Sequence, residues 1–306
     1  MLEEVQFTPD LETIWNNCLT HSRDRWPFLS YTWHLGYMEA FDTHPVIFVD
    51  TERSILIPLE IDSQIAHFAG GEEIADYLDA IGPERTKVQA WQDTISLLSK
   101  KGVNKLILRN ISQNSETIHY FGTLANATIA QEDTTPIAVL PATLDAYLET
   151  LDKKERHEFK RKIRNFEEDF PNPIIVTQNG KDARMDELVS LMKTDRSKQE
   201  FLTPSMEKFF LSLPHTAEGS LVQLNLSHQE KALASMVGFK HGHAFLLYNS
   251  GFLREYKGAG FYLKAKAMQW AIEQGFSEFN FLQGAERYKY ELGGKDQFVY
   301  RIELPL

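Results

Sequence analysis

One stretch, residues 244–291, constrains the fold more than any other part of the chain. An apolar segment at 244–251 predicts a β-strand, and a long amphipathic segment at 259–273 predicts a helix. Gly275 stands where a C-terminal helix cap is expected, and a second short strand is predicted at 279–282. The order strand, glycine loop, helix, strand is that of a βαβ-like unit, which binds ligands at the carboxyl ends of its strands.

Two glycines, Gly258 and Gly260, stand at the start of this predicted helix, and Arg254 and Lys257 come just before them. Glycine lets the backbone approach a ligand closely, and the first N–H groups of a helix lack internal partners. The pattern therefore predicts a phosphate or pyrophosphate site, although a glycine pair before a helix is also typical of a plain loop. It matches neither the dinucleotide fingerprint nor the Walker loop.

Further residues in the same stretch carry a family resemblance. The first strand contains Tyr248, the helix ends in Glu-Gln-Gly, and the second strand at 279–282 is followed by Gly284 and the pair Tyr288-Lys289. This arrangement resembles the GNAT-related acyltransferases. More narrowly, it is similar to a two-lobed branch that holds the Fem-type peptidoglycan aminoacyltransferases and bacterial proteins associated with cellulose and exopolysaccharide synthesis.

The resemblance implies an α/β (α+β) fold with two tandem GNAT-like lobes, each a mixed, mostly antiparallel sheet flanked by helices. The helices and strands predicted along the two halves of the chain follow a similar order, and Pro136 and Pro141 punctuate the segment between them. In the second half, helices are predicted over 153–169 and 183–196, and a polar loop is predicted after Gly284. We expect residues 1–138 to form the N-terminal lobe and residues 139–306 to form the C-terminal lobe that carries the acyl-donor site. The final segment, 297–304, alternates as a strand and is expected to pair with either lobe.

The resemblance also implies site residues in the second lobe. Lys289 is expected to stabilise an oxyanion or a phosphate, Tyr288 to donate to a leaving thiolate, and Glu286 to hold a proton relay. The alternatives are a surface lysine and a core tyrosine whose hydroxyl is already satisfied. The implied acyl-CoA site has seven residues: Tyr248, Asn249, Arg254, Lys257, Gly258, Gly260 and Gly284.

Two positions extend this interpretation. Glu255 stands where the family typically has Arg or Gln, and it is a second candidate for the proton relay. In the first lobe, many relatives share an acidic and aromatic patch that matches Asp76 and Tyr77, so these two residues are the expected substrate contacts.

Composition excludes several classes of protein. The net charge of −11 argues against a general nucleic-acid binder, so no DNA partner is expected. Cys18 is the only cysteine, which excludes an internal disulfide, and no Cys/His cluster predicts a metal site. The N-terminus has no signal-peptide pattern, and no segment approaches the ~18 apolar residues of a membrane span. We therefore expect a cytoplasmic protein.

Charge is concentrated in one segment, residues 153–164, which has seven Lys or Arg and two Glu. A solvated helix face is one interpretation. The other is a docking surface for an anionic ligand such as a nucleotide, CoA, a lipid-linked sugar or tRNA.

Three functions follow as hypotheses. The first is transfer of an acyl group from acetyl-CoA or another acyl-CoA to an amine or hydroxyl of a small or glycan-linked acceptor. The second is Fem-like transfer of an aminoacyl group from tRNA. The third is a degenerate pair of lobes that binds a partner or metabolite without catalysis.

Overall fold

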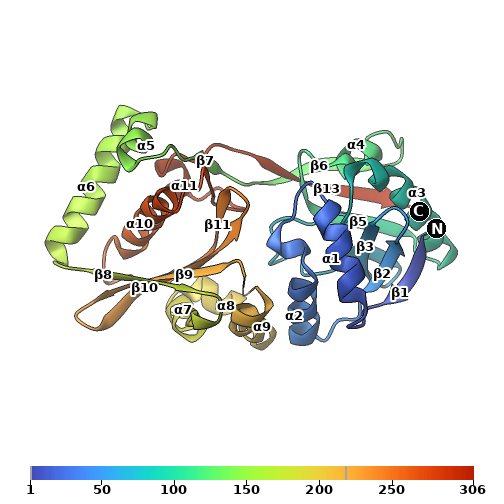
Figure 1. The fold of residues 1–306 in the computed structure, drawn as a ribbon, viewed down its shortest axis with the longest axis horizontal. Coiled ribbons are helices and arrows are strands. Elements are labelled where there is room, and N and C mark those ends of the chain that lie inside the picture. Colours follow the sequence, from blue (N-terminus) through green and yellow to red (C-terminus); the bar gives the residue numbers. More distant parts are fainter. Residues whose placement is uncertain (1, 218) are drawn as a thin grey trace. The chain divides into compact units, whose positions relative to one another are not determined.

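The computed structural model describes residues 2–217 and 219–306, and the chain forms two compact units (Figure 1). Unit 1 comprises Met1–Thr134 together with Gln297–Leu306, and unit 2 comprises Thr135–Asp296. The predicted division assigned the whole of residues 139–306 to the second lobe. The structure differs because the last ten residues return to the first unit.

Unit 1 is built on a seven-stranded sheet with the order β1-β2-β3-β4-β5-β13-β6. Neighbouring strands are antiparallel except for β4 and β5, which are parallel. The strands are β1 (Glu3–Gln6), β2 (Val46–Asp50), β3 (Ile55–Asp62), β4 (Ile65–Phe68), β5 (Lys105–Ser112), β6 (Thr128–Thr134) and β13 (Phe298–Pro305).

The return of the chain end to unit 1 has a clear physical basis. Strand β13 lies between β5 and β6 and is antiparallel to both, so its backbone groups pair on two sides. Val299, Ile302 and Leu304 are buried in the core of this unit. Sequence alternation predicted the strand, but it left open which lobe would accept it.

The helices of unit 1 bury several large aromatic side chains. Helices α1 and α3 both pack against β3, and α4 packs against α3. Trp15 on α1, Trp33 on α2 and Trp91 on α3 are almost fully buried. The helices are α1 (Leu11–His21), η1 (Pro27–Leu29), α2 (Tyr31–Phe41), α3 (Glu84–Lys100) and α4 (Glu116–Phe121).

Unit 2 has a six-stranded sheet with the order β7-β12-β11-β10-β9-β8. Only β11 and β12 are parallel, as expected for strands joined by a helix. The strands are β7 (Ile137–Val139), β8 (Ile174–Asn179), β9 (Leu221–His228), β10 (Lys231–His241), β11 (Ala244–Phe252) and β12 (Glu278–Asn280).

Helices cover both faces of this sheet (Figure 1). Helix α10 packs on β9, β10 and β11 and is itself covered by α6, whereas α7 packs on β10 and β11 and contacts α9. The helices are α5 (Leu144–Thr150), α6 (Lys153–Asp169), η2 (Gly180–Asp182), α7 (Met185–Met192), α8 (Arg196–Phe201), α9 (Pro204–Thr216), α10 (Ala259–Glu273) and α11 (Arg287–Glu291).

Two local predictions in unit 2 were wrong. A single helix was expected over 183–196, but the chain breaks after α7 and the Asp195 side chain caps α8 by accepting from the Ser197 N–H at 3.0 Å. A polar loop was expected after Gly284, where the structure has the short helix α11.

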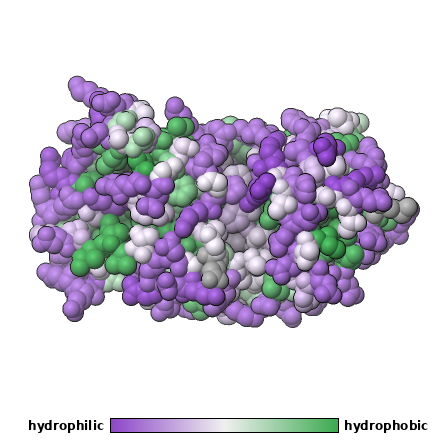
Figure 2. Space-filling model, in the orientation of Figure 1, coloured by the Kyte–Doolittle hydropathy of each residue, from purple (hydrophilic) through white to green (hydrophobic). Residues whose placement is uncertain are grey.

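The surface in Figure 2 is mostly hydrophilic. Apolar exceptions include Ile174 and Val176 on β8, the edge strand of the second sheet, which are 58% and 44% exposed. Among the described helices, none has the length and apolar character needed to cross a membrane.

Candidate active site

The central strands of unit 2 separate at one point. Strands β11 and β12 pair in parallel only as far as Leu246 and Asn280, while β11 continues to Phe252 against β10. Tyr248 is an extra residue in this ladder, because Leu247 pairs with Gly238 and Asn249 pairs with Val237. Such a bulge locally redirects the strand and often lies beside a functional site.

Gly238 makes this close approach possible. A Cβ atom at this position would lie 2.2 Å from the Leu246 carbonyl oxygen and 2.4 Å from the Phe245 ring. Any other residue would push β10 and β11 apart beside the bulge. Gly238 therefore fixes the position of the bulge at Tyr248.

The side chains that follow the bulge are held by neighbouring elements. The Tyr248 ring stacks on Phe210 of α9, with 5.7 Å between ring centroids. The Asn249 side-chain oxygen accepts from the Ser250 N–H at 3.1 Å and from the Lys198 ammonium at 3.4 Å. Residues 248–250 are all partly exposed, so this end of β11 is accessible within unit 2.

The glycine loop divides into an open and a packed position. Gly258 is the exposed N-cap of α10, has φ = 92° and has no side-chain cap. Gly260 is buried, and a Cβ atom there would lie 2.8 Å from the Phe252 ring, so this glycine serves helix–strand packing. Lys257 is exposed, whereas Arg254 is paired with Asp195.

The loop after β12 folds around the Lys289 ammonium. This side chain is 1% exposed and donates to the carbonyl oxygens of Leu282 and Gln283, the first at 3.1 Å. It also forms an ion pair with Glu286 at 2.9 Å. A lysine ammonium has only three donors, so all of them have protein partners.

This geometry changes the interpretation of Lys289. The residue was predicted to meet a developing charge, with an exposed surface lysine as the alternative. Its burial rules out the exposed alternative, and the three protein partners hold the ammonium inside the loop. Gly284 belongs to the same loop: its φ is 109°, and a Cβ atom would lie 2.4 Å from a Glu286 oxygen. Glu286 is engaged with Lys289 and is 57% exposed.

Tyr288 lies on the inner side of α11. Its ring packs edge-on against Phe281, and the Lys264 ammonium lies 4.7 Å from its centroid. Burial, with a smaller effect of Glu286, raises the pKa of the Tyr288 hydroxyl well above its ordinary value. The hydroxyl therefore stays protonated at neutral pH.

Two lysines that sequence analysis did not select converge on Ser250. Lys264 of α10 donates to the Ser250 hydroxyl oxygen at 3.1 Å, and Lys198 of α8 donates to the Ser250 carbonyl oxygen. Lys264 lies four residues from both Gly260 and Met268, which places all three on the buried side of α10. A lysine on the predicted buried side of this helix is the sequence signal that could have identified Lys264 as a site residue.

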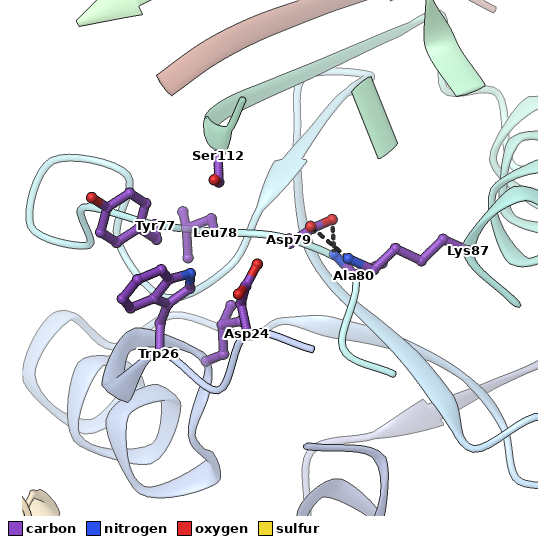
Figure 3. A pocket seen from close by; sticks show the side chains of 9 residues that line it. Asp24, Trp26, Tyr77, Leu78, Asp79, Ala80, Lys87 and Ser112 are labelled. Atoms are coloured by element: carbon purple, nitrogen blue, oxygen red, sulfur yellow. Dashed lines mark hydrogen bonds and ion pairs between the residues drawn. The ribbon is translucent and has the colours of Figure 1, made fainter. Parts of the chain in front are cut away.

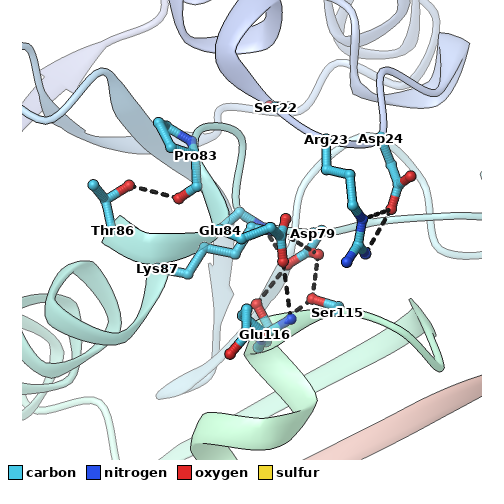
Figure 4. A network of polar contacts seen from close by, with 12 residues as sticks. Ser22, Arg23, Asp24, Asp79, Pro83, Glu84, Thr86, Lys87, Ser115 and Glu116 are labelled. Carbon is cyan, nitrogen blue, oxygen red and sulfur yellow. Dashed lines mark hydrogen bonds and ion pairs between the residues drawn. The ribbon is translucent and has the colours of Figure 1, made fainter.

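In unit 1, the predicted contact Tyr77 lines a small pocket (Figure 3). Its ring stacks on Trp26, with 4.3 Å between centroids and 21° between planes. Asp76 is partly buried beside it in the chain and does not line this pocket. Asp79 and Lys87 also line the pocket and form a polar network with α3 and α4 (Figure 4).

Residues 153–290 match the family described as the acetyltransferase (GNAT) domain. Unit 2 contains a GNAT domain. The match includes the strand bulge, the glycine loop, both lysines and α11 up to Tyr290. GNAT domains are acyltransferase folds, which fits the predicted reaction class. No match was found among curated proteins.

Solved structures resemble the whole chain. FemX is 9% identical with a TM-score of 0.67, covering 99% of this chain and 97% of that one. L-PGS from Bacillus licheniformis is 13% identical with a TM-score of 0.67, covering 96% and 91%. A tandem GNAT protein from the clavulanic acid biosynthesis pathway is 12% identical with a TM-score of 0.52, covering 99% and 98%. The predicted α/β fold of two tandem GNAT-like lobes is confirmed.

Proposed function

We propose that this chain transfers an acyl group from an acyl-CoA to an amine or hydroxyl of a small or glycan-linked acceptor. The observation that carries the proposal is the parting of β11 and β12 beside the Tyr248 bulge. A thioester is already activated, so the protein has to hold it, orient the acceptor and support the tetrahedral oxyanion with N–H groups. Backbone released from β12 pairing can supply such groups.

The start of α10 supports a phosphate-bearing donor. Gly258 is exposed, and a Cβ atom there would meet only the Phe166 ring, at 3.7 Å. The helix dipole and the Lys257 charge both favour an anion at this end of the helix. We assign Gly258 and Lys257 to the CoA phosphates. Gly260 instead sets the packing of the helix, and Arg254 is held by Asp195.

The proposed acceptor contacts belong to unit 1. The Trp26–Tyr77 stack offers an aromatic wall to the pocket of unit 1, which Asp24 and Asp79 also line, and Asp76 precedes Tyr77 in the chain. A sugar or a small amine binds well beside such a combination of an aromatic face and a carboxylate. Within unit 1 taken by itself, Asp76 and Tyr77 stay the proposed substrate contacts.

A second donor, aminoacyl-tRNA, is favoured by one observation. Helix α6 directs Phe159 and Phe166 into the core and leaves Lys153, Lys154 and Lys160 exposed. An exposed row of cations suits a phosphate backbone.

Acetyl-CoA is expected to stabilise the protein against heat. A ligand at one hundred times its Kd adds about 2.7 kcal/mol to the free energy of unfolding. Differential scanning fluorimetry with acetyl-CoA, longer acyl-CoAs and free CoA measures this as a saturable rise in Tm. A thiol-release assay with a panel of amino acids, amino sugars and polyamines then tests for turnover. Binding of CoA without thiol release would support the non-catalytic alternative.

A pair of glycine variants makes this test specific. Gly258→Ala and Gly275→Ala alter opposite ends of α10, at φ = 92° and 83°, and each costs about 1–2 kcal/mol of backbone strain. Only Gly258→Ala is expected to abolish the shift with CoA. Equal rises in Tm with CoA in both variants would show that the glycine loop does not bind CoA. If no CoA species raises the Tm of the parent protein, aminoacyl-tRNA is favoured as the donor.

A further inference from the structure

The end of β11 has a hydroxyl group that contacts a buried amine. The Lys264 nitrogen lies 3.1 Å from the Ser250 Oγ and 3.5 Å from the Gly260 carbonyl oxygen. Lys264 is 5% exposed, whereas Ser250 is partly exposed. The serine hydroxyl thus links the accessible end of the strand to a nitrogen beneath it.

The charges around Lys264 come from three elements. Lys198 approaches from α8, Lys289 from α11, and Glu286 from the loop before α11. Within the described residues, no carboxylate forms an ion pair with Lys264, because Glu286 contacts Lys289 at 2.9 Å. The other neighbours are the rings of Tyr288 and Phe252, at 4.7 Å and 5.6 Å from the ammonium.

This environment disfavours the charged form of the lysine. Burial removes its hydration, and the positive charges of Lys198 and Lys289 act in the same direction, while Glu286 opposes them. Together they lower the pKa of Lys264 from 10.5 to about 7. A lysine in this range can lose and regain a proton near neutral pH.

We propose that Lys264 takes up the proton that the acceptor loses during acyl transfer, and that the Ser250 hydroxyl relays it. This inference rests on the proposed acyltransferase function and names its missing proton acceptor. Lys264 is then a positioning and proton-storing residue behind Ser250, which contacts the acceptor. Glu286 and Glu255, the earlier candidates, are engaged with Lys289 and Lys231 respectively.

The step balances without any further reactant. The acceptor nitrogen attacks the thioester carbonyl carbon and forms the new C–N bond. Its proton passes to the Ser250 Oγ while the serine proton passes to the Lys264 nitrogen. The C–S bond then breaks, the electron pair leaves with sulfur, and the thiolate takes a proton back along the same path, which returns Lys264 to its neutral form.

The first experiment measures the protonation of Lys264 by NMR and needs no substrate. The protein is labelled with [ε-¹³C]lysine, and the resonance missing from Lys264→Met identifies the residue. Its chemical shift is expected to titrate near pH 7. Titration above pH 9.5 would overturn the proposal whether or not the acyltransferase function is correct.

The second experiment uses the acetyl-CoA and amine pair that gives thiol release. The parent kcat is expected to rise with pH through about 7 and then level, because only the neutral amine accepts a proton. Lys264→Met is expected to lower kcat by about 10²–10⁴-fold and to remove this rise. Ser250→Ala is expected to do the same while keeping the thermal shift with CoA.

Lys264→Arg separates a proton acceptor from a fixed charge. Arginine keeps the positive charge but cannot lose its proton in a protein, so no rescue is expected. Full activity in Lys264→Arg would show that the charge alone matters and would overturn the proposal. Burial disfavours the charged form of Lys264, and Ser250 is partly exposed and can bond to water instead, so Lys264→Met is expected to keep its Tm. No thiol release with any pair, together with titration near pH 7, would reject the proposed function and leave the state of Lys264 established.

Discussion

Replacing Lys87 by methionine is expected to lower the free energy of unfolding of unit 1 by about 3–5 kcal/mol, the range for removing one partner of a buried ion pair. The Lys87 ammonium lies 2.7 Å from Asp79 and 2.6 Å from Glu84, and the residue is 3% exposed. Burial works against the ammonium, but the two carboxylates hold the pKa of Lys87 above its ordinary value. Without the Lys87 ammonium, the carboxylates of Asp79 and Glu84 would lie close together with little water to screen their repulsion.

The network explains why the effect reaches beyond one pair (Figure 4). Asp79 also accepts from the hydroxyls of Ser115 and Thr117, both on α4 or its cap. Glu84 accepts from the Glu116 N–H at 3.0 Å, in the first turn of α4. Lys87 thus neutralises the two carboxylates that attach α4 to α3 and to the 79–80 segment.

A surface lysine provides the matched control. Lys101 lies 2.8 Å from Glu4, with side-chain exposures of 42% and 40%, and Lys101→Met is expected to cost less than about 1 kcal/mol. Urea unfolding followed by tryptophan fluorescence reports mainly on unit 1, since four of the five tryptophans lie there. Equal losses in the two variants would show that the buried network contributes nothing special to the fold.

Local signals in the sequence predicted the long helices well. The predicted ranges of α6 and α10 match the structure because each has a strong terminus: Asp152 accepts from the Glu155 N–H at 2.8 Å, and Gly275 has φ = 83°. Caps and periodicity act within a few residues, so a single sequence displays them.

Long-range partners were not predictable in this way. Strand β13 alternates like any half-buried strand, and only the assembled sheet of unit 1 shows that it lies between β5 and β6. The same holds for the lysines at Ser250. Lys198 and Lys264 come from helices far apart in the chain, and the pairing of β11 with its neighbours brings them together.

The burial of Lys289 was not predictable for a related reason. A Tyr-Lys pair after a glycine suggests an accessible cation at a strand end, but the residues from 282 onward curl back over the ammonium. Leu282 has φ = 58°, a conformation that costs a non-glycine residue about 1–2 kcal/mol. The buried lysine compensates for that strain by binding the carbonyl oxygens of Leu282 and Gln283.

Lys289→Met is therefore expected to lower the free energy of unfolding of unit 2 by about 2–4 kcal/mol. The change leaves two carbonyl oxygens without their donor, and an unsatisfied buried group costs about 1–3 kcal/mol. Arg287→Met alters the same short helix at an exposed side chain that pairs with Glu291 at 2.9 Å, and it is expected to cost about 0.3–0.5 kcal/mol. Calorimetry of both variants measures the difference. If Lys289→Met instead unfolds like the parent and has lost thiol release, the lysine acts in the chemistry and the loop holds its shape without it.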